Sequence, residues 1–204
     1  MVGQRAYDWM YRHWAPWDSV GVRSELRALL DSGEVSPQTH PRSIDLGCGT
    51  GANVVFLAEQ GYDAYGVDFS EVALDKARRR AADAGVLEKA TFVNGDLTAG
   101  AVAGLDGRFD LLTDFGTLDD LRPAGRRAMA LLAAALARPG GVMLFWCFYK
   151  AAKDLPWMSF RGPSKVAPAV EPGEEQDLFG EHFDLRPGPD TGTDIARCFV
   201  MTRR

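Results

Sequence analysis

The chain has 204 residues, a net charge of −5 and a sequence pI near 5.2. This acidic balance argues against binding to nucleic acid or to an anionic membrane surface, and no apolar run approaches the ~20 residues of a membrane span. The length suits one domain over residues 1–204 with a substantial core.

The three cysteines, Cys48, Cys147 and Cys198, show no paired spacing. An odd number without such spacing argues against a disulfide framework and against a zinc site. The first residues mix charged and aromatic side chains and lack the apolar stretch of a signal peptide. We therefore expect a reduced, cytoplasmic protein without a metal ion.

The first 35 residues predict an aromatic and partly helical cap. The aromatic residues at its start are Tyr7, Trp9, Tyr11, Trp14 and Trp17. Apolar residues then recur at helical spacing between Val20 and Leu30, and Asp31-Ser32-Gly33 ends that helix.

Strands and helices alternate over residues 43–149. The pattern predicts strands at 43–46, 64–68, 91–93, 109–113 and 142–149, and helices at 52–58, 71–81 and 122–138. A loop-like stretch at 150–180 precedes two more strands, at 182–185 and 195–202, with the pattern of a hairpin. These elements indicate an α/β fold of the Rossmann-like kind, with a mostly parallel sheet and helices on both faces.

A glycine turn joins the first strand to the first core helix. The segment Ser43-Ile-Asp-Leu-Gly-Cys-Gly-Thr-Gly51 places glycines at 47, 49 and 51, where backbone can approach a ligand without a Cβ in the way. The helix that follows directs its free N–H groups and its positive dipole end toward the turn. The segment therefore predicts a cradle for a nucleotide-type cofactor.

Four acids follow the predicted strands at or near their carboxyl ends. They are Asp45, Asp68, Asp96 and Asp114. Ligands of parallel sheets bind at these ends, so we expect the four side chains around the cofactor. Asp96 and Asp114 also fit the ordinary alternative of turn or loop acids.

The glycine turn alone leaves two cofactors open. Together with Asp68 it also fits the dinucleotide fingerprint, whose acid binds a ribose hydroxyl. Three further features favour a cofactor with a cationic group and an adenine amine. Asp45 stands directly before the turn, Gly95-Asp96 follows the third strand, and Pro139-Gly140-Gly141 leads into a strong fifth strand.

As a set, these motifs resemble the class I S-adenosylmethionine-dependent methyltransferases. The matching stretches, in the family's order, are Ile44–Gly51, Gly66–Ser70, Asn94–Leu97, Phe109–Asp114 and Leu136–Gly141. The resemblance implies S-adenosylmethionine as the cofactor of a core at 43–149. It also implies a seven-stranded sheet with an antiparallel last strand, so that residues 150–204 supply an acceptor-side loop and a terminal hairpin.

The resemblance further implies roles for single residues. Asp45 would lie near the cofactor's ammonium, Asp68 would bind the ribose hydroxyls, and Asp96 would take the adenine amine. Asp114 would lie near the methyl-bearing end. The expected cofactor contacts are Trp17, Asp45, Gly47, Cys48, Gly49, Gly51, Asn53, Asp68, Phe69, Asp96, Leu97 and Asp114.

Aromatic residues indicate where a methyl acceptor would bind. The segment Trp14-Ala-Pro-Trp17-Asp18 resembles the entrance segment of small-molecule methyltransferases of the thiopurine and tellurite-resistance type, which folds over the cofactor. Ring faces suit a sulfonium cation, although large aromatics are also commonly just buried. The expected acceptor pocket consists of Tyr11, Trp14, Phe115, Phe148, Tyr149 and Trp157.

Methyl transfer from a sulfonium is an in-line displacement that depends mainly on positioning. A general base is needed only when the acceptor arrives protonated, as an alcohol does. The candidates for this base are His13, Asp18, Asp114 and Tyr149. We expect His13 and Asp114 to be the catalytic residues, His13 because its ordinary pKa lies near neutrality.

These observations predict a methyltransferase that acts on an oxygen or sulfur of a small, partly apolar molecule. The Asn-Pro-Pro-Tyr-type step of amino-methylating enzymes is replaced by Asp114-Phe-Gly-Thr, which favours oxygen or sulfur. One alternative is an NAD-dependent oxidoreductase, which leaves Asp45 and Gly95-Asp96 unexplained. Another is a non-catalytic S-adenosylmethionine-binding protein. The sequence leaves both a monomer and a homodimer open.

Overall fold

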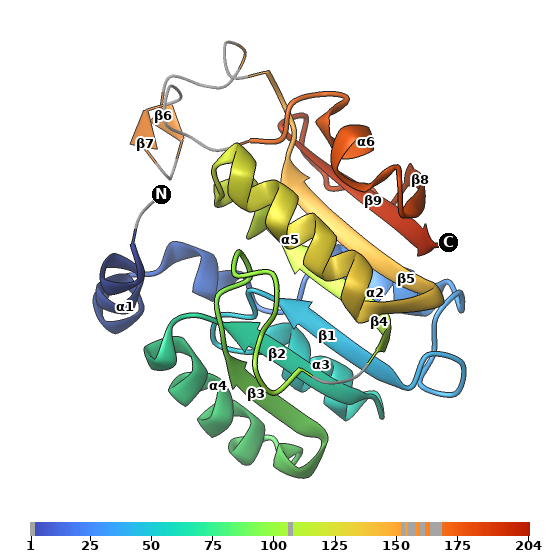
Figure 1. Ribbon diagram of the computed structural model, residues 1–204. Helices are drawn as coiled ribbons and strands as arrows, with labels where there is room; N and C mark the ends of the chain where they lie inside the picture. The colour runs from blue at the N-terminus through green and yellow to red at the C-terminus, as the bar shows by residue number, and fades with distance from the viewer. Residues whose placement is uncertain (1–2, 106–107, 152–153, 155–157, 160–161, 164–168) are drawn as a thin grey trace.

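The computed structural model describes residues 3–105, 108–151, 154, 158–159, 162–163 and 169–204 (Figure 1). Its elements, in chain order, are α1 (Gln4–His13), η1 (Pro16–Val20), α2 (Ser24–Asp31), β1 (Arg42–Leu46), α3 (Ala52–Glu59), β2 (Asp63–Asp68), α4 (Glu71–Asp83), η2 (Leu87–Lys89), β3 (Ala90–Asn94), β4 (Phe109–Phe115), η3 (Leu118–Asp120), α5 (Pro123–Leu136), β5 (Ala137–Phe148), β6 (Met158–Ser159), β7 (Gly162–Pro163), α6 (Glu174–Phe179), β8 (Phe183–Pro187) and β9 (Ala196–Arg203).

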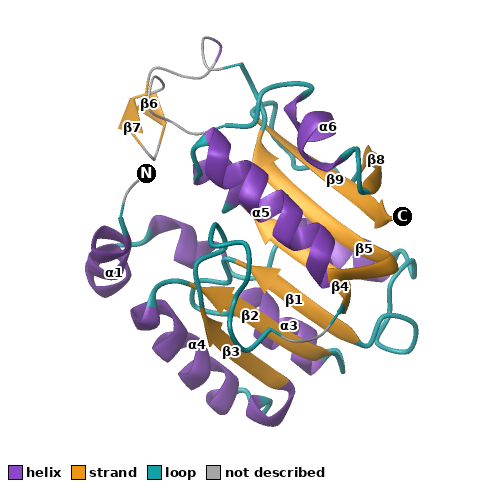
Figure 2. Cartoon of the chain, in the orientation of Figure 1, coloured by secondary structure: helices purple, strands orange, loops and turns teal. Residues whose placement is uncertain are grey.

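A seven-stranded sheet runs through the middle of the molecule in the order β3-β2-β1-β4-β5-β9-β8 (Figure 2). β1 pairs in parallel with β2 and β4, and the parallel pairing continues to β3 on one side and β5 on the other. β9 runs antiparallel to both of its neighbours, β5 and β8. The predicted mostly parallel sheet with an antiparallel last strand is therefore confirmed.

Helices cover both faces of the sheet, as the strand–helix alternation predicts (Figure 1). On one face, Leu26 of α2 and Leu57 of α3 are buried in one apolar cluster with side chains of β4 and β5. On the other face, Met129 of α5 and Phe179 of α6 pack in a second cluster that contains Ile44 of β1. Burial of these two apolar layers holds the sheet between the helices. Among the described residues, no helix combines the length and apolar character that a bilayer span requires.

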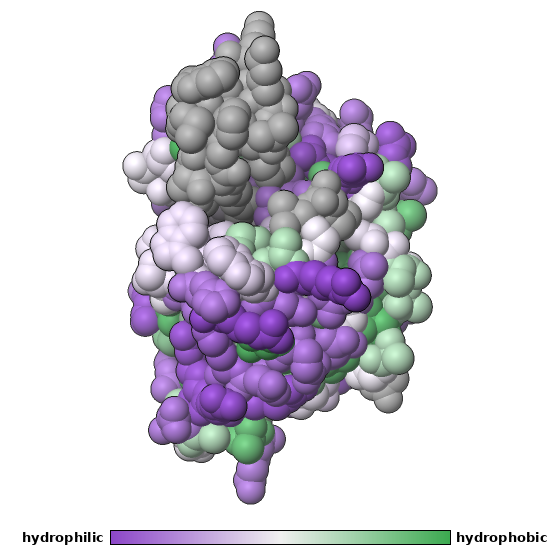
Figure 3. Space-filling view, turned by 90° about the vertical axis from the view of Figure 1, so that its left-hand side faces the viewer, coloured by the Kyte–Doolittle hydropathy of each residue, from purple (hydrophilic) through white to green (hydrophobic). Residues whose placement is uncertain are grey.

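The helix α4 separates a buried face from a charged one. The Ser70 hydroxyl accepts the Ala73 N–H and caps the start of the helix, while Leu74 is buried against the sheet side. On the outer face, Arg78 pairs with Glu71 and Asp75. Figure 3 shows a largely hydrophilic surface below the grey residues, on the side where α1 and α4 lie. The arginines at 78–80 thus belong to a solvated helix face.

The structure differs from the sequence prediction at α6 and at the start of β5. Residues 150–180 were predicted to be loop-like, and this is wrong for α6. This helix is too short to show helical periodicity, but it carries acids in its first turn. β5 begins at Ala137, five residues before the predicted strand. The Pro139-Gly140-Gly141 step lies inside this strand, beside a register shift between Phe109 and Leu111 of β4. These three residues therefore form an irregular part of β5, although their sequence is typical of a turn.

Candidate functional site

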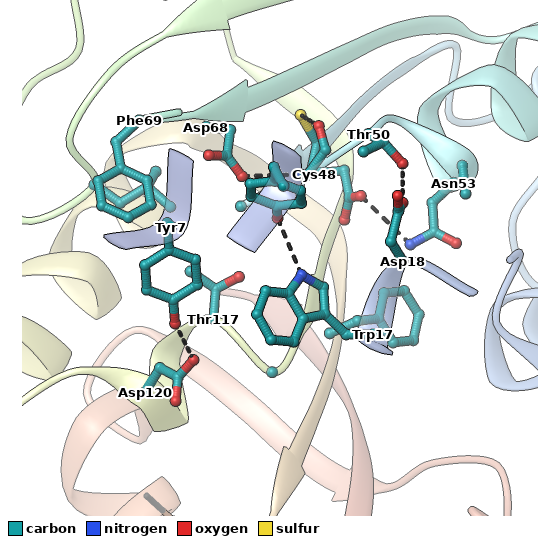
Figure 4. Close-up of a pocket in the computed structure, with 18 of the residues that line it drawn as sticks. Tyr7, Trp17, Asp18, Cys48, Thr50, Asn53, Asp68, Phe69, Thr117 and Asp120 are labelled. Atoms are coloured by element: carbon teal, nitrogen blue, oxygen red, sulfur yellow. Dashed lines mark hydrogen bonds between the residues drawn. The ribbon is translucent and has the colours of Figure 1, made fainter. Parts of the chain in front are cut away.

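A pocket opens at the carboxyl ends of the parallel strands, between the glycine turn and the N-terminal segment (Figure 4). The predicted site residues that line it are Tyr11, Trp17, Asp18, Asp45, Gly47, Cys48, Gly49, Asn53, Asp68, Phe69, Asp96, Leu97 and Phe115. These residues come from distant parts of the chain, and the order of the sheet brings them together.

Gly47 and Gly49 line the pocket in backbone conformations that favour glycine. Their φ angles are +78° and +53°, respectively. A Cβ at Gly47 would lie 2.0 Å from the Thr117 Oγ1, and one at Gly49 would lie 2.9 Å from the Tyr11 Oη. Gly51 lies outside the lining, and its Cβ would meet the Ala77 side chain at 2.8 Å. The first two glycines therefore shape the pocket, while Gly51 permits close approach of α3 and α4.

Asp68, at the end of β2, holds the glycine turn in place. One carboxylate oxygen accepts the Gly49 N–H at 2.9 Å, and the other accepts the Ser70 N–H at 2.8 Å. Burial raises the pKa of this carboxyl, and the backbone N–H donors oppose that rise. Asp68 therefore presents a buried carboxyl to the pocket and also fixes the turn that surrounds it.

Asp45, on β1, is buried beneath the turn. The register of β1 and β4 places it opposite Thr113, whose hydroxyl donates to Asp45 at 2.6 Å, and the Asn53 amide donates to its other oxygen at 3.4 Å. Burial raises the pKa of Asp45 to about 6, although these two hydrogen bonds and the charge of Arg23 lower it. Burial thus moves the ionisation of Asp45 toward neutral pH.

The aromatic N-terminal segment forms one wall of the pocket. The Tyr7 ring lies edge-on to Phe69, with 5.3 Å between ring centroids, and its hydroxyl donates to Asp120 at 2.6 Å. The Trp17 indole N–H donates to the Tyr11 hydroxyl at 3.2 Å. Burial raises the pKa of Tyr11, with Asp68 as the second cause, so its hydroxyl stays protonated. Figure 4 shows the Tyr7 ring beside Phe69, with its hydroxyl directed at Asp120.

Two carboxylates tie this segment to the core. Asp8 of α1 accepts the Ser70 hydroxyl at 2.5 Å, next to the start of α4. Asp18 of η1 accepts the hydroxyl of Thr50 in the glycine turn. The segment is therefore held over the pocket by polar contacts at both of its helices, in addition to its aromatic packing.

Asp114 does not line the pocket, contrary to the sequence prediction. Side chains alternate along a strand, so Asp114 lies on the opposite face of β4 from Phe115, which lines the pocket. Its carboxylate accepts the backbone N–H groups of Thr117 and Leu118, at 2.9 and 3.1 Å. Asp114 therefore shapes the loop after β4, and the structure does not place it beside a reacting group.

His13 and Trp14 also lie outside the pocket lining. His13 is two residues beyond Tyr11, about 200° around the helix, and its exposed ring packs on Trp9 with 5.0 Å between centroids. Trp14 is 65% exposed. Both were expected at the acceptor site, and neither faces it, because α1 presents Tyr7 and Tyr11 inward.

The predicted acceptor residues at and just after the end of β5 lie outside the pocket lining as well. Phe148 packs against Trp146 in the core, with 5.2 Å between ring centroids. Tyr149 lies in the packing on the side of α5 and α6, where its hydroxyl donates to Glu175 at 3.1 Å. Trp157 lies outside the described residues.

Several further lining residues were not predicted from the sequence. They include Tyr7, Arg23, Thr50, Thr117 and Asp120. Tyr7 belongs to the aromatic cluster that the sequence shows, so α-helical spacing from Tyr11 could have found it. Arg23 and Asp120 stand among ordinary charged residues, and their position depends on how α2 and η3 pack.

Residues 44–141 match a family model described as a methyltransferase domain. A 2-heptyl-1-hydroxyquinolin-4(1H)-one methyltransferase of Mycobacteroides abscessus is 31% identical over 137 residues, which is 67% of this chain and 57% of that protein. A ubiquinone biosynthesis O-methyltransferase of Methylococcus capsulatus is 27% identical over 157 residues, 74% of this chain and 61% of that protein. The chain thus spans about three fifths of the length of these curated relatives.

The fold also has solved counterparts. One structure, from work on the conversion of a disulfide bond into a thioacetal group during echinomycin biosynthesis, superposes with a TM-score of 0.76 at 24% identity, covering 98% of this chain and 93% of the other. At this identity the likeness concerns the fold. Together with the matched domain, the strand order and the acids around the glycine turn, it shows that the chain belongs to the class I S-adenosylmethionine-dependent methyltransferases.

Proposed function

We propose that this chain binds S-adenosylmethionine in the pocket and transfers its methyl group to an oxygen or sulfur atom of a small, partly apolar molecule. The observation that carries the proposal is the meeting of Asp45, Asp68 and Asp96 in one pocket behind a glycine turn. Its aromatic wall offers ring faces on which a sulfonium cation is favoured. The three acids belong to the ends of different strands, and the order of these strands in the sheet brings them together.

The residues present fit this cofactor. The turn at Gly47 and Gly49 leaves backbone open to the pocket, since neither position carries a Cβ. The buried Asp45 carboxyl suits an ammonium group, and Asp68 suits ribose hydroxyls. Asp96 is exposed beside the apolar Leu97, an arrangement that suits an adenine amine and ring. When bound, S-adenosylmethionine supplies an electrophilic methyl group on a sulfonium.

The chain's own residues position the reactants and exclude water. Tyr7, Tyr11 and Trp17 cover the pocket from the N-terminal segment, and Phe115 lines it from the end of β4. Holding two reactants in line can supply about 7–11 kcal/mol of the barrier reduction. The pocket therefore acts mainly by orienting the two reactants.

For a protonated acceptor, the base comes from the acids that line the pocket. Asp18 and Asp120 both do so, and each already accepts a hydroxyl hydrogen, from Thr50 and Tyr7 respectively. Either carboxylate is better placed than His13, which lies on the outer side of α1. A carboxylic acid is already ionised at neutral pH, and a thiol, with an ordinary pKa of about 8.5, needs less help than an alcohol.

The names of the reported relatives agree with an oxygen or sulfur acceptor. The Methylococcus relative is called an O-methyltransferase, and the echinomycin structure concerns the conversion of a disulfide bond. For this chain the acceptor atom remains part of the proposal. The thiopurine and tellurite-resistance subgroup, the single-domain organisation, the cytoplasmic location and a homodimer stay predictions.

An NAD-dependent oxidoreductase is the less favoured function. Its fingerprint uses the glycine turn and the acid at Asp68. It gives no role to the buried Asp45 carboxyl, whose retention costs folding free energy unless a cation binds there. A non-catalytic S-adenosylmethionine-binding protein would share every contact described above, so only turnover separates it from an enzyme.

The test is release of S-adenosylhomocysteine from purified protein and S-adenosylmethionine, with a panel of thiols, phenols, sugars and medium-chain acids. We expect turnover on one class, and we expect its loss in the Asp68→Ala variant. The His13→Ala variant is the matched control, because its ring lies outside the pocket lining. Tight product binding without turnover on any class would support a non-catalytic protein instead.

A further inference from the structure

The buried guanidinium of Arg126 holds the loop that follows β4. Arg126 lies near the start of α5 and is 8% exposed. Its Nε donates to the Leu121 carbonyl at 3.0 Å, and its Nη2 donates to the Asp119 carbonyl at 2.9 Å. Asp120 stands between these two carbonyls in the chain. One planar group with fixed donor directions therefore sets the backbone on both sides of Asp120.

Asp120 connects this loop to the N-terminal cap across the pocket. Its carboxylate accepts the Tyr7 hydroxyl at 2.6 Å, and both residues line the pocket (Figure 4). Tyr7 belongs to α1, and its ring packs edge-on against Phe69, just after β2. A hydrogen bond weakens steeply when its length and angle depart from the preferred values. The contact with Tyr7 therefore depends on where Arg126 holds the backbone of Asp120.

The remaining guanidinium nitrogen of Arg126 pairs with α6. Its Nη1 donates to the Glu174 Oε2 at 2.7 Å, and the same oxygen accepts the Glu171 N–H at 3.1 Å. A buried charge is costly unless it is paired and hydrogen-bonded, so the guanidinium is stable only in the position that keeps these acceptors. The loop after β4 is thereby fixed to two helices, α5 and α6.

We propose that Arg126 is a positioning residue of the site, which acts through Asp120 and Tyr7 to keep α1 closed over the bound cofactor. Arg126 is not among the described residues that line the pocket, so any effect on a ligand there passes through other residues. Without the guanidinium, the Tyr7 hydrogen bond forms for less of the time and the cap opens more often, so that S-adenosylhomocysteine leaves faster. The release part of this inference rests on the proposed function, whereas the effect on α1 does not.

The first measurement is amide hydrogen exchange of α1 in the ligand-free wild type, Arg126→Met, Tyr7→Phe and the double variant. We expect each single variant to quicken exchange about fivefold, the effect of one lost hydrogen bond. The double variant should exchange no faster than Tyr7→Phe alone, because Arg126 acts through that bond. Unchanged exchange in Arg126→Met, or additive effects in the double variant, would overturn the proposal.

Two further variants separate this role from a loss of stability. Arg203 also donates to two carbonyls, those of Ala134 near the far end of α5 and of His182, each at 3.0 Å. Arg203→Met should therefore lower stability but leave the exchange of α1 unchanged, and equal quickening in both arginine variants would overturn the proposal. Arg126→Lys keeps the charge without the planar donor pattern, so its exchange should be intermediate. If Arg126→Met does not fold, Arg126→Lys carries the same comparison with Tyr7→Phe.

The second measurement is the rate at which S-adenosylhomocysteine dissociates, followed by tryptophan fluorescence because Trp17 lines the pocket. We expect dissociation to be about fivefold faster in Arg126→Met and in Tyr7→Phe, with no further increase in the double variant and no change in Arg203→Met. Faster exchange of α1 with unchanged dissociation would overturn the retention of the ligand by the cap. A wild type that binds no S-adenosylhomocysteine refutes the proposed function, while the exchange measurement still decides the role of Arg126.

Discussion

The Asp45→Asn substitution should strengthen the fold and weaken the site at the same time. Asp45 is fully enclosed, and burial raises the pKa of its carboxyl from 3.8 to about 6. Each pKa unit corresponds to about 1.4 kcal/mol, so ionised Asp45 costs the folded state about 3 kcal/mol above pH 6. Asparagine has the same shape, carries no charge, and retains an oxygen that can accept the Thr113 hydroxyl.

The sign of the pH dependence follows from the direction of the shift. The folded state binds the Asp45 proton more tightly than the unfolded chain does, so this group makes stability fall as the pH rises from about 4 to about 6. Above pH 6 the cost is constant. The variant lacks this group, so its advantage should appear over that interval and vanish at lower pH.

The assay is paired thermal and denaturant unfolding of the wild type and Asp45→Asn at several pH values between 4 and 8, without cofactor. At pH 8 we expect the free energy of unfolding of the variant to exceed that of the wild type by about 1–3 kcal/mol. For a chain of this size, each kcal/mol raises Tm by about 2–4 °C. The affinity of the variant for S-adenosylhomocysteine should fall about tenfold or more, because the ammonium loses an ionised partner. Equal stability at pH 8, or a variant that is less stable there, would refute the argument from burial.

Three further predictions concern the turn, the cap and the base. Gly49→Ala should weaken S-adenosylhomocysteine binding about tenfold or more by calorimetry, since φ is +53° and a Cβ would lie 2.9 Å from the Tyr11 hydroxyl. Adding Tyr11→Phe should restore part of that loss; if it restores nothing, the clash is not the cause. Tyr7→Phe removes the 2.6 Å bond to Asp120, so amide hydrogen exchange in α1 should quicken, while unchanged exchange would show that the bond does not hold the cap. His13→Ala should keep turnover within about twofold of the wild type, and a large loss would return His13 to the mechanism.

The fold was predictable because its signals are local and repeated. Apolar strands alternate with helices at regular intervals, and such a pattern specifies a mostly parallel sheet with helices on both faces. Among the elements that the pattern missed, α6 has only six residues. A helix of that length shows less than two turns of periodicity, so its stability comes from the packing of Phe179 against Phe145 and Phe183.

The meeting of three strand-end acids in one pocket was predictable for the same reason. Asp45, Asp68 and Asp96 follow strands whose carboxyl ends must meet at one edge of a parallel sheet. Asp114 shows the limit of that argument. Knowing that a residue ends a strand does not say which face it occupies, and a shift of one position reverses the face.

The residues expected to bind the methyl acceptor were predicted less well, because their positions depend on how the helices pack against the sheet. Tyr149 lies on the α5 and α6 side of the sheet, and His13 lies on the outer side of α1. Arg23 reaches the pocket only because α2 packs beside α3 and the ring of Trp146 supports the guanidinium. Each of these placements results from tertiary packing, which a linear pattern does not encode.

The most direct test of the proposed cofactor site is a calorimetric titration of the purified protein with S-adenosylhomocysteine, repeated in the presence of excess NAD. We expect one saturable site whose affinity NAD leaves unchanged and Asp68→Ala reduces about tenfold or more. Displacement of S-adenosylhomocysteine by NAD would favour an oxidoreductase. If S-adenosylhomocysteine does not bind, then Asp45, Asp68 and the glycine turn do not form a site for it.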